Sequence, residues 1–237
     1  MILSYEQLEN IATTVIQDYR TVTGIMIEAT SIEQLATDYL GLTVSFEDLS
    51  DDGSLCGLTA YSDTKLQLYV KGILRTIHLK KNQIVLDSSF IKPGQVRTLC
   101  GKRRFTLAHE VAHQILFALD SNEEDIKYTK PYATRLLHTA RELNTAQDWN
   151  EWQANVLGAA LLMPKDSVSS FMARIHRSTQ LISYNGYFNC LDKQVIKHFC
   201  NNFAVSRSAA SIRLKHLGYL NEYPINIYSD SSEVHYG

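Results

Sequence analysis

The segment RFTLAHEVAHQILFAL, residues 104–119, places apolar residues at helical spacing around the pattern H-E-x-x-H. In an α-helix, residues four positions apart lie on one face, so His109 and His113 can offer two imidazole nitrogens to one metal ion. Glu110 is placed to hold a water that a zinc ion would make acidic. The spacing therefore predicts a zinc site with the groups needed to hydrolyse a peptide bond.

Apolar neighbours surround this polar triplet on nearly every side, which is typical of a buried helix. They are Leu107, Ala108, Val111, Ala112, Ile115, Leu116 and Leu119. Burying two imidazoles and a carboxylate without partners costs on the order of several kcal/mol, so something must satisfy them. Two ordinary surface or core histidines are the alternative reading, but a metal ion is the simpler explanation.

Composition limits the other classes of function. A chain of 237 residues with 45% hydrophobic content predicts one compact domain, or one with a small appendage. The formal charge of −2 gives no global attraction to nucleic acid or to an anionic membrane. No signal peptide and no apolar run of membrane-spanning length are visible, so we expect a cytoplasmic protein. The cysteines are scattered and suggest neither disulfides nor a cysteine zinc site: Cys56, Cys100, Cys190 and Cys200.

The first third of the chain changes from a helical to a strand pattern. Residues 4–7 and 31–34 both match the capping box S-x-x-E/Q and predict two helices, the second ended by Gly41 in the left-handed conformation. From 42 to 89 the pattern predicts one small sheet of about four or five strands. The expected strands are 43–46, 57–62, 66–70, 74–79 and 83–86.

Helices are expected over most of the remainder. The motif helix should begin between 93 and 104 and end near 119, and a second long helix should span 149–163. Pro164 ends that helix and opens another at about 165–174. A short helix is expected near 133–143, within a polar stretch from 120 to 148. Two helices within 191–220, joined by a turn near 203–206 with Ser206 as N-cap, are shaped like a helix-turn-helix.

A catalytic zinc site needs a third protein ligand. The extended pattern with a third histidine is absent, because Leu116 and Leu119 stand at its last two positions. Glu151 is the best candidate, since it is an acid at the start of an otherwise apolar helix; a favourable charge at the helix N-terminus is the alternative reading. Asn155, one turn on, could orient a ligand or bond a loop. The other histidines stay open as ligands: His78, His138, His176, His198, His216 and His235.

Three stretches together resemble the ImmA/IrrE family of zinc metallopeptidases: RRFTLAHEVAH at 103–113, EWQAN at 151–155 and AALLMP at 159–164. The segment 205–218 is also similar to a sequence often seen there, and the main resemblance covers roughly 42–164. It implies that His109, His113 and Glu151 bind Zn²⁺ and that Glu110 is the general base.

The resemblance also implies an architecture. We expect an α+β, zincin-like core, in which a small twisted sheet packs on the motif helix and on the helix that carries Glu151. This metallopeptidase domain should span 1–175, followed by a helical, helix-turn-helix-like appendage over 176–237. Gln153 stands where the family often has a second glutamate, and 38 positions separate His113 from Glu151, more than the family usually has.

The function implied is an endopeptidase that cleaves a helix-turn-helix repressor and so controls a mobile element or a stress response. The alternative is a regulator that sequesters the repressor by binding alone. Candidate donors to the oxyanion are Tyr132, His138, His176, Tyr184 and Tyr187. Basic residues cluster within 193–216, but a charged solvated face explains them better than direct DNA binding does. These residues are Lys193, Lys197, His198, Arg207, Arg213, Lys215 and His216.

Overall fold

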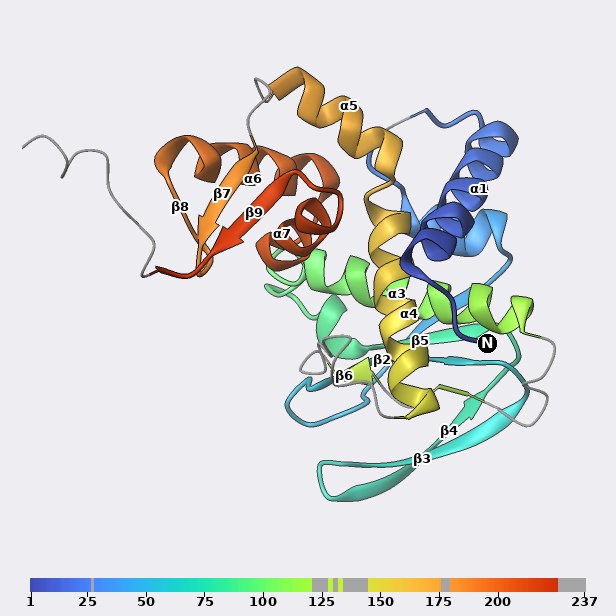
Figure 1. The fold of residues 1–237 in the computed structure, drawn as a ribbon. Helices are drawn as coiled ribbons and strands as arrows, with labels where there is room; N and C mark the ends of the chain where they lie inside the picture. The colour runs from blue at the N-terminus through green and yellow to red at the C-terminus, as the bar shows by residue number, and fades with distance from the viewer. Residues whose placement is uncertain (27, 121–127, 130–131, 134–144, 176–179, 226–237) are drawn as a thin grey trace, which may run out of the picture.

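The computed structural model describes residues 1–26, 28–120, 128–129, 132–133, 145–175 and 180–225 (Figure 1). Helices and small sheets are mixed along this part of the chain, which confirms the α+β class. None of the described helices combines the length and the apolar character needed to cross a membrane.

The two predicted N-terminal helices are present, but only one has its predicted cap. Helix α1 (Tyr5–Thr23) begins at the predicted capping box, in which the Ser4 hydroxyl accepts from the Gln7 amide and the Gln7 side chain accepts from the Ser4 amide. Helix α2 (Ile32–Gln34) continues directly into the π-helical turn η1 (Leu35–Tyr39). Ser31 makes no side-chain capping bond with the described residues, so the second capping box was wrong. Gly41 has φ +65° as predicted.

All five predicted strands are confirmed. They are β1 (Thr43–Glu47), β2 (Leu55–Ala60), β3 (Thr64–Val70), β4 (Ile73–Leu79) and β5 (Gln83–Asp87). The expectation of one sheet was wrong, because β3 and β4 form a hairpin of their own. Residues 73–76 of β4 face solvent, and the other end of the strand, at Ile77 and Leu79, packs on Leu58 and Val85 of the main sheet. The main sheet has the order β1-β5-β2-β6, in which β6 (Tyr132–Ala133) pairs with β2.

The turn η2 (Ser88–Ile91) leads from the sheet toward the predicted helices. Helix α3 (Cys100–Leu119) carries the H-E-x-x-H pattern, α4 (Ala146–Leu162) carries Glu151, and α5 (Lys165–Ile175) follows Pro164. A capping box that the sequence reading missed begins α4, where Thr145 and Asp148 bond each other's backbone amides. The short helix predicted near 133–143 lies outside the described residues, apart from Ala133 in β6.

Helix α4 crosses α3 at very close range (Figure 1). A Cβ atom added at Gly158 would lie 3.0 Å from the Ala108 carbonyl group and from the His109 amide nitrogen. Such contacts are with backbone atoms, which cannot move aside as a flexible side chain can. Only glycine allows this approach, and it lies two turns beyond Glu151 on the same helix.

The C-terminal segment contains strands as well as helices. The two predicted helices are confirmed as α6 (Cys190–Phe203) and α7 (Arg207–His216), with Ser206 accepting from the Ala209 amide as N-cap. The appendage expected to be helical also contains a sheet, which the sequence did not predict, formed by β7 (Leu181–Tyr184), β8 (Tyr187–Phe188) and β9 (Leu220–Tyr223). The missed signal was the Asn185-Gly186 pair, which takes positive φ at both positions and closes the β7–β8 hairpin.

One hydrophobic core joins both ends of the chain. Buried residues of α1, α3, α4 and α5 form a single cluster with those of α6, α7, β7 and β9. Arg213 of α7 is 1% exposed and donates from Nη2 to Glu9 Oε2 of α1 and from Nε to the Met163 carbonyl, each at 3.0 Å. The division of the chain at 175/176 stays a prediction, and the core continues across it.

Several cations of the predicted basic cluster contact the protein itself. Besides the buried Arg213, Lys215 pairs with Glu222 at 2.7 Å, and the Arg207 guanidinium lies over the Phe188 ring at 4.9 Å. These contacts involve three of the seven residues of the basic cluster. The expectation that the chain does not bind DNA directly stays a prediction.

The Gly158→Ala substitution tests the close contact between α3 and α4. Helix propensity alone would make alanine more stable than glycine by about 1 kcal/mol. We expect instead a lower free energy of unfolding, by about 1–3 kcal/mol, because the methyl group meets backbone atoms. Urea unfolding followed by circular dichroism measures the change, and a midpoint equal to or above that of the wild type would contradict the close contact.

Candidate metal centre

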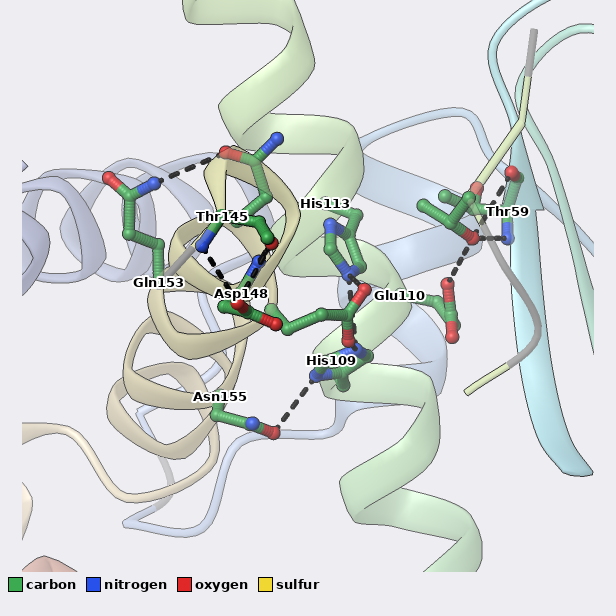
Figure 2. Close-up of polar contacts among 11 residues, drawn as sticks. Thr59, His109, Glu110, His113, Thr145, Asp148, Gln153 and Asn155 are labelled. Atoms are coloured by element: carbon green, nitrogen blue, oxygen red, sulfur yellow. Dashed lines mark hydrogen bonds and ion pairs between the residues drawn. The ribbon is translucent and has the colours of Figure 1, made fainter. Parts of the chain in front are cut away.

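The predicted ligands come together between α3 and α4. His109 and His113 lie one turn apart on α3 (Figure 2). Glu151, in the first half of α4, places its carboxylate beside both imidazoles. The Nε2 atoms of the two histidines are 3.1 Å apart. Glu151 Oε2 lies 3.2 Å from Nε2 of His109, and Oε1 lies 3.4 Å from Nε2 of His113.

These distances fit a tetrahedral metal ion. Zinc ligands at about 2.0–2.1 Å from the ion are separated from one another by about 3.3–3.4 Å in a tetrahedron. Nε2 of His109 and Nε2 of His113 are 3.1 Å apart, and each lies within 3.4 Å of a different oxygen of the Glu151 carboxylate, so the donors have close to this spacing. Two imidazoles and one carboxylate are also a donor set that zinc accepts. His109, His113 and Glu151 therefore form a candidate zinc site.

A neighbouring amide orients one of the imidazoles. Asn155 Oδ1 lies 3.1 Å from Nδ1 of His109, and because an amide oxygen can only accept, Nδ1 must carry the hydrogen. Nε2 of His109 then presents its lone pair to the cluster. Of the two roles left open for Asn155, the structure supports the one that orients a ligand.

Burial and charge shape the protonation of the cluster. His109 is fully buried, and this burial lowers its pKa to about 4, against the opposing effect of its hydrogen bonds with Glu151 and Asn155. Burial alone would raise the pKa of Glu151, but hydrogen bonds with His109 and His113 outweigh this effect. The pKa of Glu151 is therefore well below its ordinary range. At neutral pH the site therefore offers an uncharged His109 and an ionised carboxylate, the forms that bind a metal ion.

Glu110 extends from a neighbouring face of α3 toward Thr59 of β2 (Figure 2). Its side chain is fully buried, and burial raises its pKa well above the ordinary value, with a further contribution from the charge of Glu151. One carboxylate oxygen, Oε2, accepts from the Thr129 hydroxyl at 3.3 Å. The other, Oε1, has no hydrogen-bond partner among the described residues. An orphaned buried oxygen is costly, which indicates that a further group belongs beside it.

The other sequence candidates fall elsewhere or outside the described chain. His78, His198 and His216 lie on β4, α6 and α7 and do not join the cluster. The remaining three, His138, His176 and His235, lie outside the described residues. Of the oxyanion candidates, Tyr184 and Tyr187 belong to the C-terminal sheet and Tyr132 lies in β6. Their role as donors to the oxyanion stays a prediction.

Gln153, which stands where the family often has a second glutamate, contacts the N-terminal segment of the chain. Its Oε1 accepts from the Leu3 amide at 2.7 Å, and its Nε2 donates to the Met1 carbonyl at 3.3 Å. The side chain therefore holds the N-terminal segment against α4. A neutral amide suits this task because it can both accept and donate.

The sequence analysis did not single out Gln114, a buried polar residue of the same helix as Glu110. Gln114, one turn after Glu110, donates to the Thr59 hydroxyl at 2.6 Å and to the Ala60 carbonyl at 3.0 Å. Thr59 in turn shares hydrogen bonds with Thr129, the residue that contacts Glu110. The separation of four positions between Glu110 and Gln114 was a usable signal for a shared face, but their partners come from distant parts of the chain.

A family model described as the IrrE N-terminal-like domain matches residues 101–215. This region contains all three candidate ligands and Glu110. Residues 101–215 belong to the ImmA/IrrE metallopeptidase family. No curated protein matches the chain. The family match begins with α3 and continues into α7, so it extends beyond the expected limit at 164 and does not include the strands β1–β5.

Removing single ligands tests the metal centre. We expect one Zn²⁺ per wild-type chain after dialysis against a mild chelator, and loss of that zinc in Glu151→Ala, because two histidines alone do not close the site. Asn155→Ala should weaken zinc affinity by about 10–100-fold, since it frees the orientation of His109.

Elemental analysis and a competitive chelator titration provide these measurements. His198→Ala removes an exposed imidazole outside the cluster and serves as the matched control, with unchanged affinity expected. Equal zinc retention by Glu151→Ala and by His198→Ala would exclude Glu151 as a ligand.

Proposed function

We propose that this protein is a zinc-dependent endopeptidase in which His109, His113 and Glu151 hold the metal ion and Glu110 is the general base. The observation that carries the proposal is a cluster beside the buried Glu110: two imidazole nitrogens 3.1 Å apart, with the two oxygens of the Glu151 carboxylate at 3.2 and 3.4 Å from them. Membership of residues 101–215 in a family of metallopeptidases supports the same reaction.

Metal binding and proton transfer are carried out from two neighbouring faces of α3. When bound, zinc supplies a Lewis acid that lowers the pKa of a water and polarises the peptide carbonyl. His109 and His113 face α4 and supply neutral nitrogen ligands, while Glu151 contributes the negative charge. Glu110 faces the sheet, and its Oε1 accepts the proton that the attacking water loses. Glu110 then returns a proton to the departing amine, so that the base is regenerated.

For the substrate we propose a helix-turn-helix transcriptional repressor, whose cleavage would switch on a mobile element or a stress response. The support is the resemblance to the ImmA/IrrE family, and the contacts within the chain do not bear on it. The second possibility is regulation by sequestration, in which the zinc fold binds the repressor without cutting it. Cleavage separates the two, because they share the same ligands.

The Glu110→Gln substitution is the decisive test of hydrolysis. The amide keeps the shape of the side chain but cannot accept a proton, so cleavage should fall by at least about 100-fold while zinc content stays at the wild-type value. Cleavage is measured by mass spectrometry on a mixture of random peptides and on helix-turn-helix repressors encoded beside the gene. Wild-type cleavage by zinc-loaded Glu110→Gln would contradict the base assignment. Full derepression by an inactive Glu110→Gln protein would favour sequestration.

A further inference from the structure

The carboxylate of Glu110 is held from one side only. Thr129 reaches it from a segment that runs antiparallel to the edge of β2, with Tyr128 opposite Ala60 and β6 farther along the same edge. Thr129 is 8% exposed, and its hydroxyl lies 3.3 Å from Glu110 Oε2. A residue far along the sequence from the motif thus contacts the group that the proposed function makes the base.

The hydrogen bonds around Thr129 determine where its hydroxyl hydrogen points. The Thr59 amide donates to Thr129 Oγ1 at 2.9 Å, which occupies one lone pair of this oxygen. Among the described residues, two acceptors remain within reach of its single hydrogen: Glu110 Oε2 at 3.3 Å and the Thr59 carbonyl at 3.5 Å. That carbonyl already accepts from the Thr129 amide at 2.9 Å. The carboxylate, which is closer and bears more negative charge, is therefore the favoured acceptor.

The backbone keeps Thr129 in place for this contact. Its amide and its hydroxyl both bond the main chain of Thr59, which lies in the middle of the main sheet and is fully buried. Main-chain atoms of a paired strand move little, so the hydroxyl is a fixed point. A glutamate has three side-chain torsions, and a single fixed hydrogen bond at one oxygen restricts all of them.

We propose that Thr129 is a positioning residue for Glu110: its hydroxyl holds Oε2 and leaves Oε1 to receive the proton of the attacking water. The inference rests on the proposed function, because it assigns Glu110 the role of base. It also explains why the two oxygens differ, since Oε2 has a partner and Oε1 has none among the described residues. Proton transfer needs an oxygen aimed at the water, and an error of about 1 Å in such placement costs about 100-fold in rate.

The test compares three substitutions. Thr129→Val keeps the shape of the side chain and removes the hydroxyl, whereas Thr129→Ser keeps the hydroxyl. The matched control is Thr106→Val on α3, one turn before Glu110, because its buried hydroxyl has no partner among the described residues. Thr129→Ala repeats the test without a second methyl group if the valine variant does not fold.

The first readout needs no substrate. Crystal structures of the zinc-loaded proteins should show one conformer of the Glu110 carboxylate in the wild type, Thr129→Ser and Thr106→Val, and more than one in Thr129→Val. A single wild-type conformer of Glu110 in Thr129→Val would overturn the proposal.

The second readout is kinetic, on one peptide that the wild type cuts from a random mixture. Thr129→Val should lower kcat by about 10–100-fold with KM unchanged, and Thr129→Ser should restore kcat to within about threefold. Wild-type kcat in Thr129→Val beside an inactive Glu110→Gln would refute the positioning role and leave the peptidase intact. If Glu110→Gln cuts the peptide as well as the wild type does, the proposed function fails. The conformer of Glu110 still decides whether Thr129 holds it.

Discussion

The contact of α4 with α3 at Gly158 is the constraint on which the candidate metal centre depends. With no side chain at this position, the α4 backbone lies directly against the carbonyl group of Ala108 and the amide of His109. Glu151 and Asn155 extend from the same helix, and both reach the imidazoles from there. A larger residue would separate the helices and move the carboxylate away from both histidines at once. The closeness of the Glu151 carboxylate to both imidazoles is thus a consequence of helix packing.

Helix α3 handles its buried polar groups by dividing them between two faces. The histidines meet α4, where a carboxylate and an amide are their partners, whereas Glu110 and Gln114 meet β2 and the segment at Thr129. Both imidazoles, Gln114 and one carboxylate oxygen of Glu110 have described partners in this arrangement, and Glu110 Oε1 has none. A metal ion beside the histidines and a water within reach of Glu110 Oε1 would complete the set. The same division keeps the ligands and the base from competing for the same contacts.

The C-terminal segment contributes to the main hydrophobic core of the protein. Its helices and strands bury apolar residues in the same cluster as α1 and α4, and Arg213 carries a charge into that core, where Glu9 neutralises it. A buried ion pair is costly to break, because either partner left alone is an uncompensated charge. The link between α7 and α1 therefore ties the two ends of the chain together. It also explains why a helix-turn-helix shape does not leave every cation of this segment facing solvent.

The sequence by itself determined most of the described helices, the first five strands and the two histidines of the candidate site, while the resemblance to a known family selected Glu151 among the open candidates. Local chemistry is sufficient for these features: the capping box at Ser4, the break at Pro164, and two histidines four positions apart on an apolar helix. The same local reasoning overlooked the Asn185-Gly186 turn, although its signal was present. Only the tertiary structure decided which sheet each strand joins, that Gly158 allows the helices to touch, and that Thr129 reaches Glu110. These features depend on contacts between residues far apart in the sequence, and no local pattern specifies which distant backbone or hydroxyl will be within hydrogen-bonding distance.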